Sequence, residues 1–185
     1  RDVVQPGGSL HGNGAMWAGN AKPGAWFSYA NLPWGVVAEA MEGATGERFD
    51  RLMKRLVLEP LAVPGGFNPA EFPAGELANL ATLYRKRETV DGKDIWRSPD
   101  GPWHAQVDDY GKSAPEPRAG PDYVPATNGT LFAPQGGLRT SAAGLARIMR
   151  MLMDGGRLDG KVFLREETVE AMLSRVALSE RRALA

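Results

Sequence analysis

Apolar residues recur about every 3.6 positions in four segments, which is the spacing of a helix with one buried face. We therefore expect helices over residues 32–45, 48–58, 141–154 and 166–176. The positions expected to face the core are, helix by helix, Leu32, Val36, Val37, Ala40 and Met41; Phe49, Leu52, Met53 and Leu56; Leu145, Ile148, Met149 and Leu152; and Val169, Met172 and Leu173.

A different pattern occupies residues 79–97, where residues typical of strands flank Asp91-Gly92. Both residues of this pair tolerate positive φ, so the pattern predicts a β-hairpin with a tight turn. Residues 98–135 show no periodicity, and we expect a long loop that carries function or wraps another part of the protein. No alternation of strands and helices is visible. The expected fold class is therefore α+β, mainly helical, with one hairpin.

Composition excludes several classes of function. The chain has 22 basic and 22 acidic residues, so it offers no basic field for a nucleic acid. It contains no cysteine and only 2 histidines, and we expect neither a metal site nor a cofactor. No apolar run reaches the roughly 18 residues that a transmembrane helix needs. No signal peptide is visible, and the chain begins with Arg1 and not with methionine, so we expect a processed product, an engineered piece or a fragment.

The most informative candidate for chemistry is the segment Tyr29-Ala30-Asn31, just before the first expected helix. A phenol can move a proton, and a carboxamide can both donate and accept a hydrogen bond. Residues i and i+2 of an extended segment share a face, so a catalytic role predicts that both side chains border one open cleft. The structural alternative is a buried tyrosine followed by an asparagine helix cap. Trp26 and Trp34 flank the segment and are candidates to line an acyl pocket.

Other residues have weaker functional interpretations. Gly136 and Gly137 either shape a pocket wall or form a tight turn before a helix that Thr140 or Ser141 caps. For His104, which follows a tryptophan, we favour a packed loop histidine over a ligand contact. For Asp108-Asp109 we favour a solvated loop pair over a cation site, because no third oxygen ligand is suitably spaced.

Short motifs follow one another in a characteristic order. The first set is Pro23-Gly24, Tyr29-Ala30-Asn31, Thr45-Gly46 and Leu58-Glu59-Pro60-Leu61. The second set is Gly136-Gly137-Leu138-Arg139-Thr140-Ser141, Leu145-Ala146-Arg147, Gly155-Gly156-Arg157-Leu158-Asp159-Gly160-Lys161 and Glu167-Thr168-Val169. Over residues 23–62 and 131–173 this order resembles the serine β-lactamase and penicillin-binding-protein family, especially class C enzymes, related esterases and D-amino-acid peptidases.

The resemblance implies a helical subdomain of a larger fold, in which a second, α/β subdomain completes the site. Residues 1–185 are then a single incomplete domain, with a Tyr-x-Asn region (23–62), a loop and hairpin region (63–135) and C-terminal helices (136–185). In this family a serine attacks an acyl carbon and water opens the acyl-enzyme. The resemblance gives Tyr29 a role in proton transfer and Asn31 a role in holding a lysine and the substrate amide. It also implies a periplasmic or secreted location.

The chain departs from the family at the nucleophile. The family's serine lies in a Ser-x-x-Lys motif, and none of the serines here is followed by lysine three residues later. The family's third motif, Lys-Thr-Gly or His-x-Gly on a strand, is also missing. We therefore expect the chain alone to be inactive, and the intact protein to act on a small amide or ester: a β-lactam, a D-alanyl peptide or a carboxylic ester.

Two rival interpretations stay open. One is a non-catalytic relative that binds a ligand or partner, and the other is an unrelated helical interaction domain. If a subdomain is missing, apolar surface is exposed beside the Tyr-x-Asn segment. We then expect self-association or a partner that supplies the missing subdomain.

Overall fold

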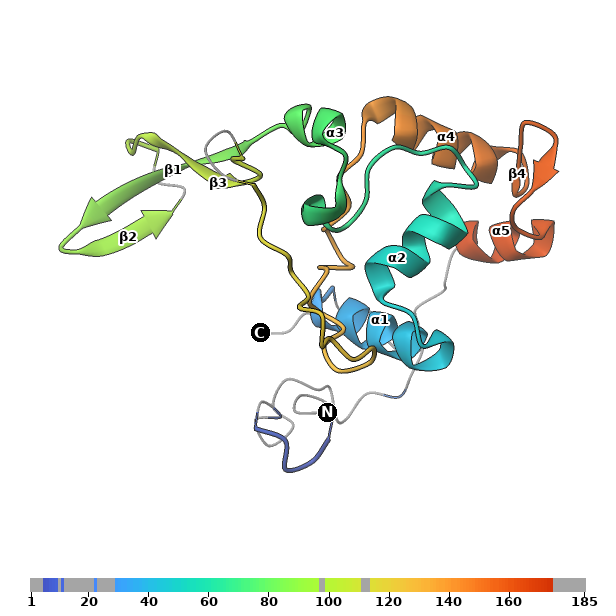
Figure 1. Ribbon diagram of the computed structural model, residues 1–185, viewed down its shortest axis with the longest axis horizontal. Coiled ribbons are helices and arrows are strands. Elements are labelled where there is room, and N and C mark those ends of the chain that lie inside the picture. The colour runs from blue at the N-terminus through green and yellow to red at the C-terminus, as the bar shows by residue number, and fades with distance from the viewer. Residues whose placement is uncertain are drawn as a thin grey trace.

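The computed structural model describes residues 5–9, 11, 22, 29–96, 99–110 and 114–174. Its elements are, in chain order, α1 (Leu32–Thr45), α2 (Phe49–Met53), a π-helical turn (Lys54–Leu58), a 3-10 turn (Pro69–Glu71), α3 (Ala74–Ala78), β1 (Leu83–Val90), β2 (Lys93–Trp96), β3 (Trp103–Val107), α4 (Ala142–Met153), β4 (Arg157–Leu158), β5 (Lys161–Val162) and α5 (Glu166–Leu173). Figure 1 shows the sheet of β1, β2 and β3 extending from a body that holds the longer helices. This arrangement is an α+β fold.

The predicted hairpin is confirmed, and it belongs to a larger sheet. Asp91 and Gly92 have φ of 50° and 74°, as a two-residue hairpin turn with positive φ at both positions requires. Strand β3 pairs antiparallel with the other side of β1, which gives a three-stranded sheet of order β2-β1-β3. The expectation of a continuous loop over residues 98–135 is therefore wrong for β3. Its sequence, Trp-His-Ala-Gln-Val, does alternate apolar and polar residues, but the run is only five residues long and is flanked by irregular segments, so the strand was missed.

The positions of the four helices are confirmed, although part of the second has another geometry and the last ends at Leu173; residues 175 and 176 of that prediction lie outside the described residues. Residues Lys54–Leu58 form a π-helical turn, in which hydrogen bonds span five residues. Within this wider turn Leu58 is buried and Leu56 is exposed, whereas α-helical spacing predicts that Leu56 faces the core. The short helix α3 was not predicted, because its five residues give no periodicity.

The buried face of α1 also differs from the prediction. Its buried residues are Gly35, Ala38 and Glu42, whereas Val36 and Val37 are exposed. Small side chains at two of these positions let a loop approach the helix closely, and hydrogen bonds satisfy the buried carboxylate of the third. The apolar pattern alone therefore selects the wrong face.

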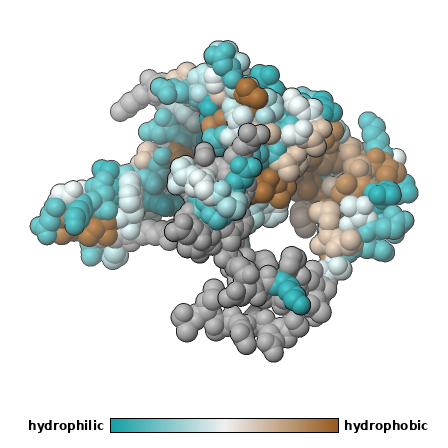
Figure 2. All heavy atoms as spheres, turned by 90° about the horizontal axis from the view of Figure 1, so that it is seen from below, coloured by the Kyte–Doolittle hydropathy of each residue, from teal (hydrophilic) through white to brown (hydrophobic). Residues whose placement is uncertain are grey.

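Two apolar clusters form the core. One joins the end of the second helix to α4 and β4, through Leu58, Leu61, Val63, Met151 and Leu158. The other joins α1, α2 and two loops, through Ala38, Phe49, Phe67 and Phe132. Several residues predicted to be buried lie outside both clusters and are exposed, namely Leu145, Met149, Met172 and Leu173. In Figure 2, apolar side chains are visible on the surface between hydrophilic ones.

Candidate active-site pair and cavity

Helix α1 is fixed in place by the loop over residues 120–133. A side chain at Gly129 would collide with the carbonyl oxygen of Gly35, so only glycine permits this close approach. Further along α1, the buried carboxylate of Glu42 accepts hydrogen bonds from the Ala126 amide at 2.8 Å and from the Tyr123 hydroxyl at 2.7 Å. These contacts hold the helix whose first turn follows the Tyr-x-Asn segment.

Glu42 also connects α1 to α2. Its Oε1 accepts a hydrogen bond from the Phe49 amide at 2.7 Å, so both carboxylate oxygens have donors. Burial, together with the hydrogen bond to Glu42, raises the pKa of the Tyr123 hydroxyl to about 12. A neutral tyrosine that donates to a buried carboxylate is the stable arrangement at neutral pH.

The side chains of Tyr29 and Asn31 point toward each other. The Tyr29 hydroxyl donates a hydrogen bond to Asn31 Oδ1 over 3.1 Å, and the Tyr29 side chain is 77% exposed. Asn31 precedes α1 in a helical conformation (φ −85°, ψ −35°) and makes no side-chain cap. The alternative of a buried tyrosine and a capping asparagine therefore does not describe this segment. The two side chains share a side as predicted, although Asn31 is not extended.

Two tryptophans, Trp26 and Trp34, flank this pair in the sequence. Trp34 lies in the first turn of α1 and is 53% exposed, so its ring is available to a ligand. Trp26 lies outside the described residues. Their proposed role in an acyl pocket stays a prediction.

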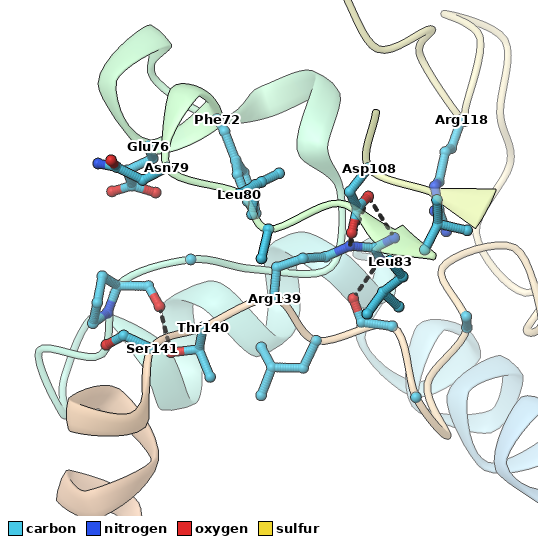
Figure 3. A pocket seen from close by; sticks show the side chains of 18 residues that line it. Phe72, Glu76, Asn79, Leu80, Leu83, Asp108, Arg118, Arg139, Thr140 and Ser141 are labelled. Atoms are coloured by element: carbon cyan, nitrogen blue, oxygen red, sulfur yellow. Dashed lines mark hydrogen bonds and ion pairs between the residues drawn. The ribbon is translucent and has the colours of Figure 1, made fainter. Parts of the chain in front are cut away.

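A cavity of about 720 Å³ lies between α3, the base of the sheet and the segment before α4 (Figure 3). Its volume is in the range of small-molecule sites. Apolar residues form much of its wall, including Phe72, Leu80, Leu83, Val107 and Leu138. Its charged lining residues are Glu76, Asp108, Arg118 and Arg139. Tyr29, Asn31 and Trp34 are not among the residues that line it, so an open cleft beside the Tyr-Asn pair stays a prediction.

Gly136 and Gly137 line this cavity and also form a turn. The amides of both glycines donate to the Ala133 carbonyl, at 3.0 Å and 2.6 Å. A Cβ at Gly137 would crowd the carbonyl oxygens of Phe132 and Ala133, whereas a Cβ at Gly136 would meet nothing within 4 Å. Gly137 is thus required by the turn, and both residues contribute backbone to the cavity wall. Substrate binding at these positions stays a prediction.

Asp108 and Arg139 form an ion pair on the cavity wall. The Arg139 guanidinium donates to both Asp108 oxygens, with Nε–Oδ2 and Nη2–Oδ1 distances of 3.0 Å. Both side chains are nearly buried, at 8% and 14% exposure. The expectation that Asp108 belongs to a solvated loop pair is therefore wrong. Its partner Arg139 lies 31 positions away in the sequence, and no sequence motif predicts such a contact.

This ion pair also orders its neighbours. Arg139 Nη1 donates to the Gly137 carbonyl at 2.6 Å, which ties the pair to the glycine turn. The Tyr110 hydroxyl donates to Asp108 Oδ1 at 3.1 Å. Burial, and then the hydrogen bond to Asp108, raise the pKa of Tyr110. The end of β3 and the segment before α4 are consequently linked across the cavity.

His104 lies in strand β3 and not in a loop, which corrects our prediction. Its Nδ1 is 3.4 Å from Arg87 Nη2, while the neighbouring Trp103 is exposed and lies under the Lys86 ammonium, 5.7 Å from the ring centroid. Successive strand residues point to opposite faces, so the histidine and the tryptophan do not pack together. The structure therefore gives no support to a ligand role for His104.

Within the described ranges, no three His, Asp or Glu side chains are placed to hold a metal ion. The helices in the same ranges are each too short or too polar to cross a membrane.

The described elements bear directly on the class of protein. A Tyr-x-Asn segment opens the first helix, and a Gly-Gly-Leu turn precedes α4, in the order typical of β-lactamase-related serine hydrolases. The sequence profile of the Beta-lactamase family matches residues 12–183. The chain therefore belongs to the β-lactamase family. None of the curated proteins compared with the chain shows significant sequence similarity to it.

Proposed function

We propose that the chain forms the helical subdomain and connecting loops of a serine hydrolase, which cleaves an amide or ester bond through an acyl-enzyme. Membership of the β-lactamase family supports the serine hydrolase class. The hydrogen-bonded pair of Tyr29 and Asn31, exposed at the start of α1, is the observation that carries the proposal. Residues 1–185 then constitute one incomplete domain.

The pair is chemically suited to proton transfer. The Tyr29 hydroxyl uses its hydrogen to bind Asn31 Oδ1, and among the described residues the phenolic lone pairs and the Asn31 Nδ2 hydrogens have no other partner. In the proposed reaction a serine oxygen attacks the acyl carbon, its proton passes by way of Tyr29 to the leaving nitrogen or oxygen, and the scissile bond breaks. Water then attacks the acyl-serine, which restores the serine hydroxyl and releases a carboxylic acid.

The proposed reaction needs groups beyond Tyr29 and Asn31. A phenol has an ordinary pKa of about 10, so it becomes an effective base at neutral pH only when nearby cations lower that value. In the proposal, a Ser-x-x-Lys motif elsewhere in the intact protein supplies both the nucleophile and such a cation. The substrate is a β-lactam, a D-alanyl peptide or a carboxylic ester.

A second candidate function is ligand or partner binding without catalysis. It is favoured by one observation, which is that none of the serines in the chain is followed by lysine three residues later. An intact protein without Ser-x-x-Lys supports this alternative. An intact protein with the motif supports hydrolysis.

The decisive experiment measures hydrolysis of nitrocefin and p-nitrophenyl acetate by the full-length gene product. We expect Tyr29→Phe to lower kcat/KM by about 100-fold or more, since positioned acid–base groups contribute roughly that factor. Tyr84→Phe is the matched control, because Tyr84 is exposed on the sheet, and it keeps wild-type activity. The isolated chain shows no turnover above background.

Two results contradict the proposal. One is unchanged kcat/KM in the Tyr29→Phe variant of an active full-length protein. The other is turnover by the isolated chain that Tyr29→Phe abolishes, since a nucleophile then lies within these residues.

A further inference from the structure

The cavity shown in Figure 3 has an uneven distribution of charge. Arg118 lies on the same side of the cavity as Asp108 and Arg139, whereas Glu76 and Asn79 lie on the opposite side. Asp108 is already committed to Arg139 through a bidentate ion pair. Arg118 therefore adds a second guanidinium at the end where the lining carboxylate is already paired, so the charged lining residues at this end sum to a positive charge.

Arg118 is the source of that charge. Among the residues that the structure describes, its guanidinium has no hydrogen-bond or ion-pair partner, and the side chain is half-buried. Other polar groups on the wall are engaged within the protein: Asn79 donates to the Gly75 carbonyl, Thr140 donates to the Pro64 carbonyl and Ser141 Oγ accepts from the Gly144 amide. An arginine held at a cavity wall without a partner is suited to bind a carboxylate or a similar anion.

Apolar side chains line the cavity between the Arg118 end and the Glu76 end. Leu83 and Val107 line the cavity and are 59% and 43% exposed, and Phe72 and Leu80 complete this wall. Covering such surface with the apolar part of a ligand removes it from water. The opposite end carries Glu76, whose carboxylate has no partner among the described residues and repels a second negative group.

We infer that this cavity binds an amphipathic monocarboxylate, with its carboxylate on Arg118 and its apolar body against Phe72, Leu80 and Leu83. Glu76 makes the site selective against dicarboxylates that span the cavity. The inference goes beyond the proposed hydrolysis, because neither Tyr29 nor Asn31 lines this cavity. Binding can therefore be tested without any turnover.

Isothermal titration calorimetry on the 185-residue chain, with three eight-carbon probes, tests the inference. Octanoate has the required charge and body, octanamide is its neutral analogue and octanedioate carries a second carboxylate. We expect octanoate to bind at least about tenfold more tightly than the other two, as a charge-assisted hydrogen bond provides. Arg118→Gln removes the preference of octanoate over octanamide, and Glu76→Gln strengthens binding of octanedioate.

Arg165→Gln is the matched control, because Arg165 is exposed and does not line the cavity. This substitution removes the same positive charge as Arg118→Gln. It keeps the wild-type preference, and circular dichroism verifies that each variant is folded. The inference is overturned by equal affinity for octanoate and octanamide, by an equal loss in the Arg118 and Arg165 variants, or by no binding of octanoate at millimolar concentration. Each of these outcomes can be distinguished from a failure of the proposed function, because the experiment measures binding and not hydrolysis.

Discussion

Tyr123 and Glu42 show how single residues define the packing around α1. The buried Glu42 carboxylate binds the Tyr123 hydroxyl and backbone amides of two other segments. A buried carboxylate is costly unless donors surround it, so each of these bonds restricts the arrangement of α1, α2 and the loop over residues 120–133. Sequence periodicity did not find this contact, because a glutamate on a helix is ordinarily solvated.

The raised pKa of Tyr123 predicts a loss of stability in alkali. A tyrosine in the unfolded chain has a pKa of about 10, whereas the folded protein raises it to about 12. The folded state holds this proton more tightly, so the contribution of Tyr123 is complete below the unfolded pKa. It declines as pH rises through the folded pKa.

Urea unfolding at several pH values between about 9 and 12 measures this effect, a window set by the two tyrosine pKa values. We expect Tyr123→Phe to be less stable than the wild type at neutral pH, because it loses a hydrogen bond to a buried charge. The variant also shows a shallower decline of the unfolding free energy in alkali. An identical decline in the two proteins contradicts the prediction.

At the scale of elements, the hairpin of β1 and β2 depends on its turn. Gly92 has a φ of 74°, which places it in the left-handed region that glycine adopts without strain. A Cβ there meets nothing within 4 Å, so the backbone conformation alone penalises substitution. We expect Gly92→Ala to destabilise the protein by about 1 kcal/mol.

Gly75 provides a matched comparison within α3. Its added Cβ also meets nothing within 4 Å, but the residue lies in a helix. We expect Gly75→Ala to be neutral or stabilising by up to about 1 kcal/mol, because alanine favours the helical conformation. Thermal unfolding measures the stability of both variants. If Gly92→Ala and Gly75→Ala lose the same stability, the positive φ of the turn is not the cause of the loss at Gly92.

The molecule as a whole exposes apolar side chains along α4. Leu145, Met149 and Met153 follow one another at intervals of four residues and are all exposed. Side chains at that spacing lie on one helical face, so they form a continuous apolar stripe. Such a stripe is typical of a surface that another polypeptide covers.

We therefore expect the isolated chain to self-associate, with a sedimentation coefficient that increases with protein concentration. The double substitution Leu145→Lys and Met149→Lys decreases this association, because it places charges within the stripe. Val162→Lys, at an exposed position in β5, is the control and leaves the association unchanged. A concentration-independent monomer in the wild-type chain contradicts the prediction.

The sequence by itself determined the features that depend on short-range chemistry. Helical periodicity located α1, α4 and α5, and Asp91-Gly92 located the hairpin turn. The order of short motifs indicated the family that the profile match identifies. The Tyr-Ala-Asn spacing predicted that Tyr29 and Asn31 share a side, and a hydrogen bond joins them, although Asn31 is helical and not extended.

Only the tertiary structure decided which helix faces are buried and which charges meet. Asp108 pairs with Arg139 across 31 positions, and Glu42 binds Tyr123 across 81. Such contacts depend on how loops fold back over the helices, which local patterns do not encode. The same long-range packing brings Arg118 and Glu76 to one cavity, because the three-dimensional arrangement and not sequence spacing sets which residues line it.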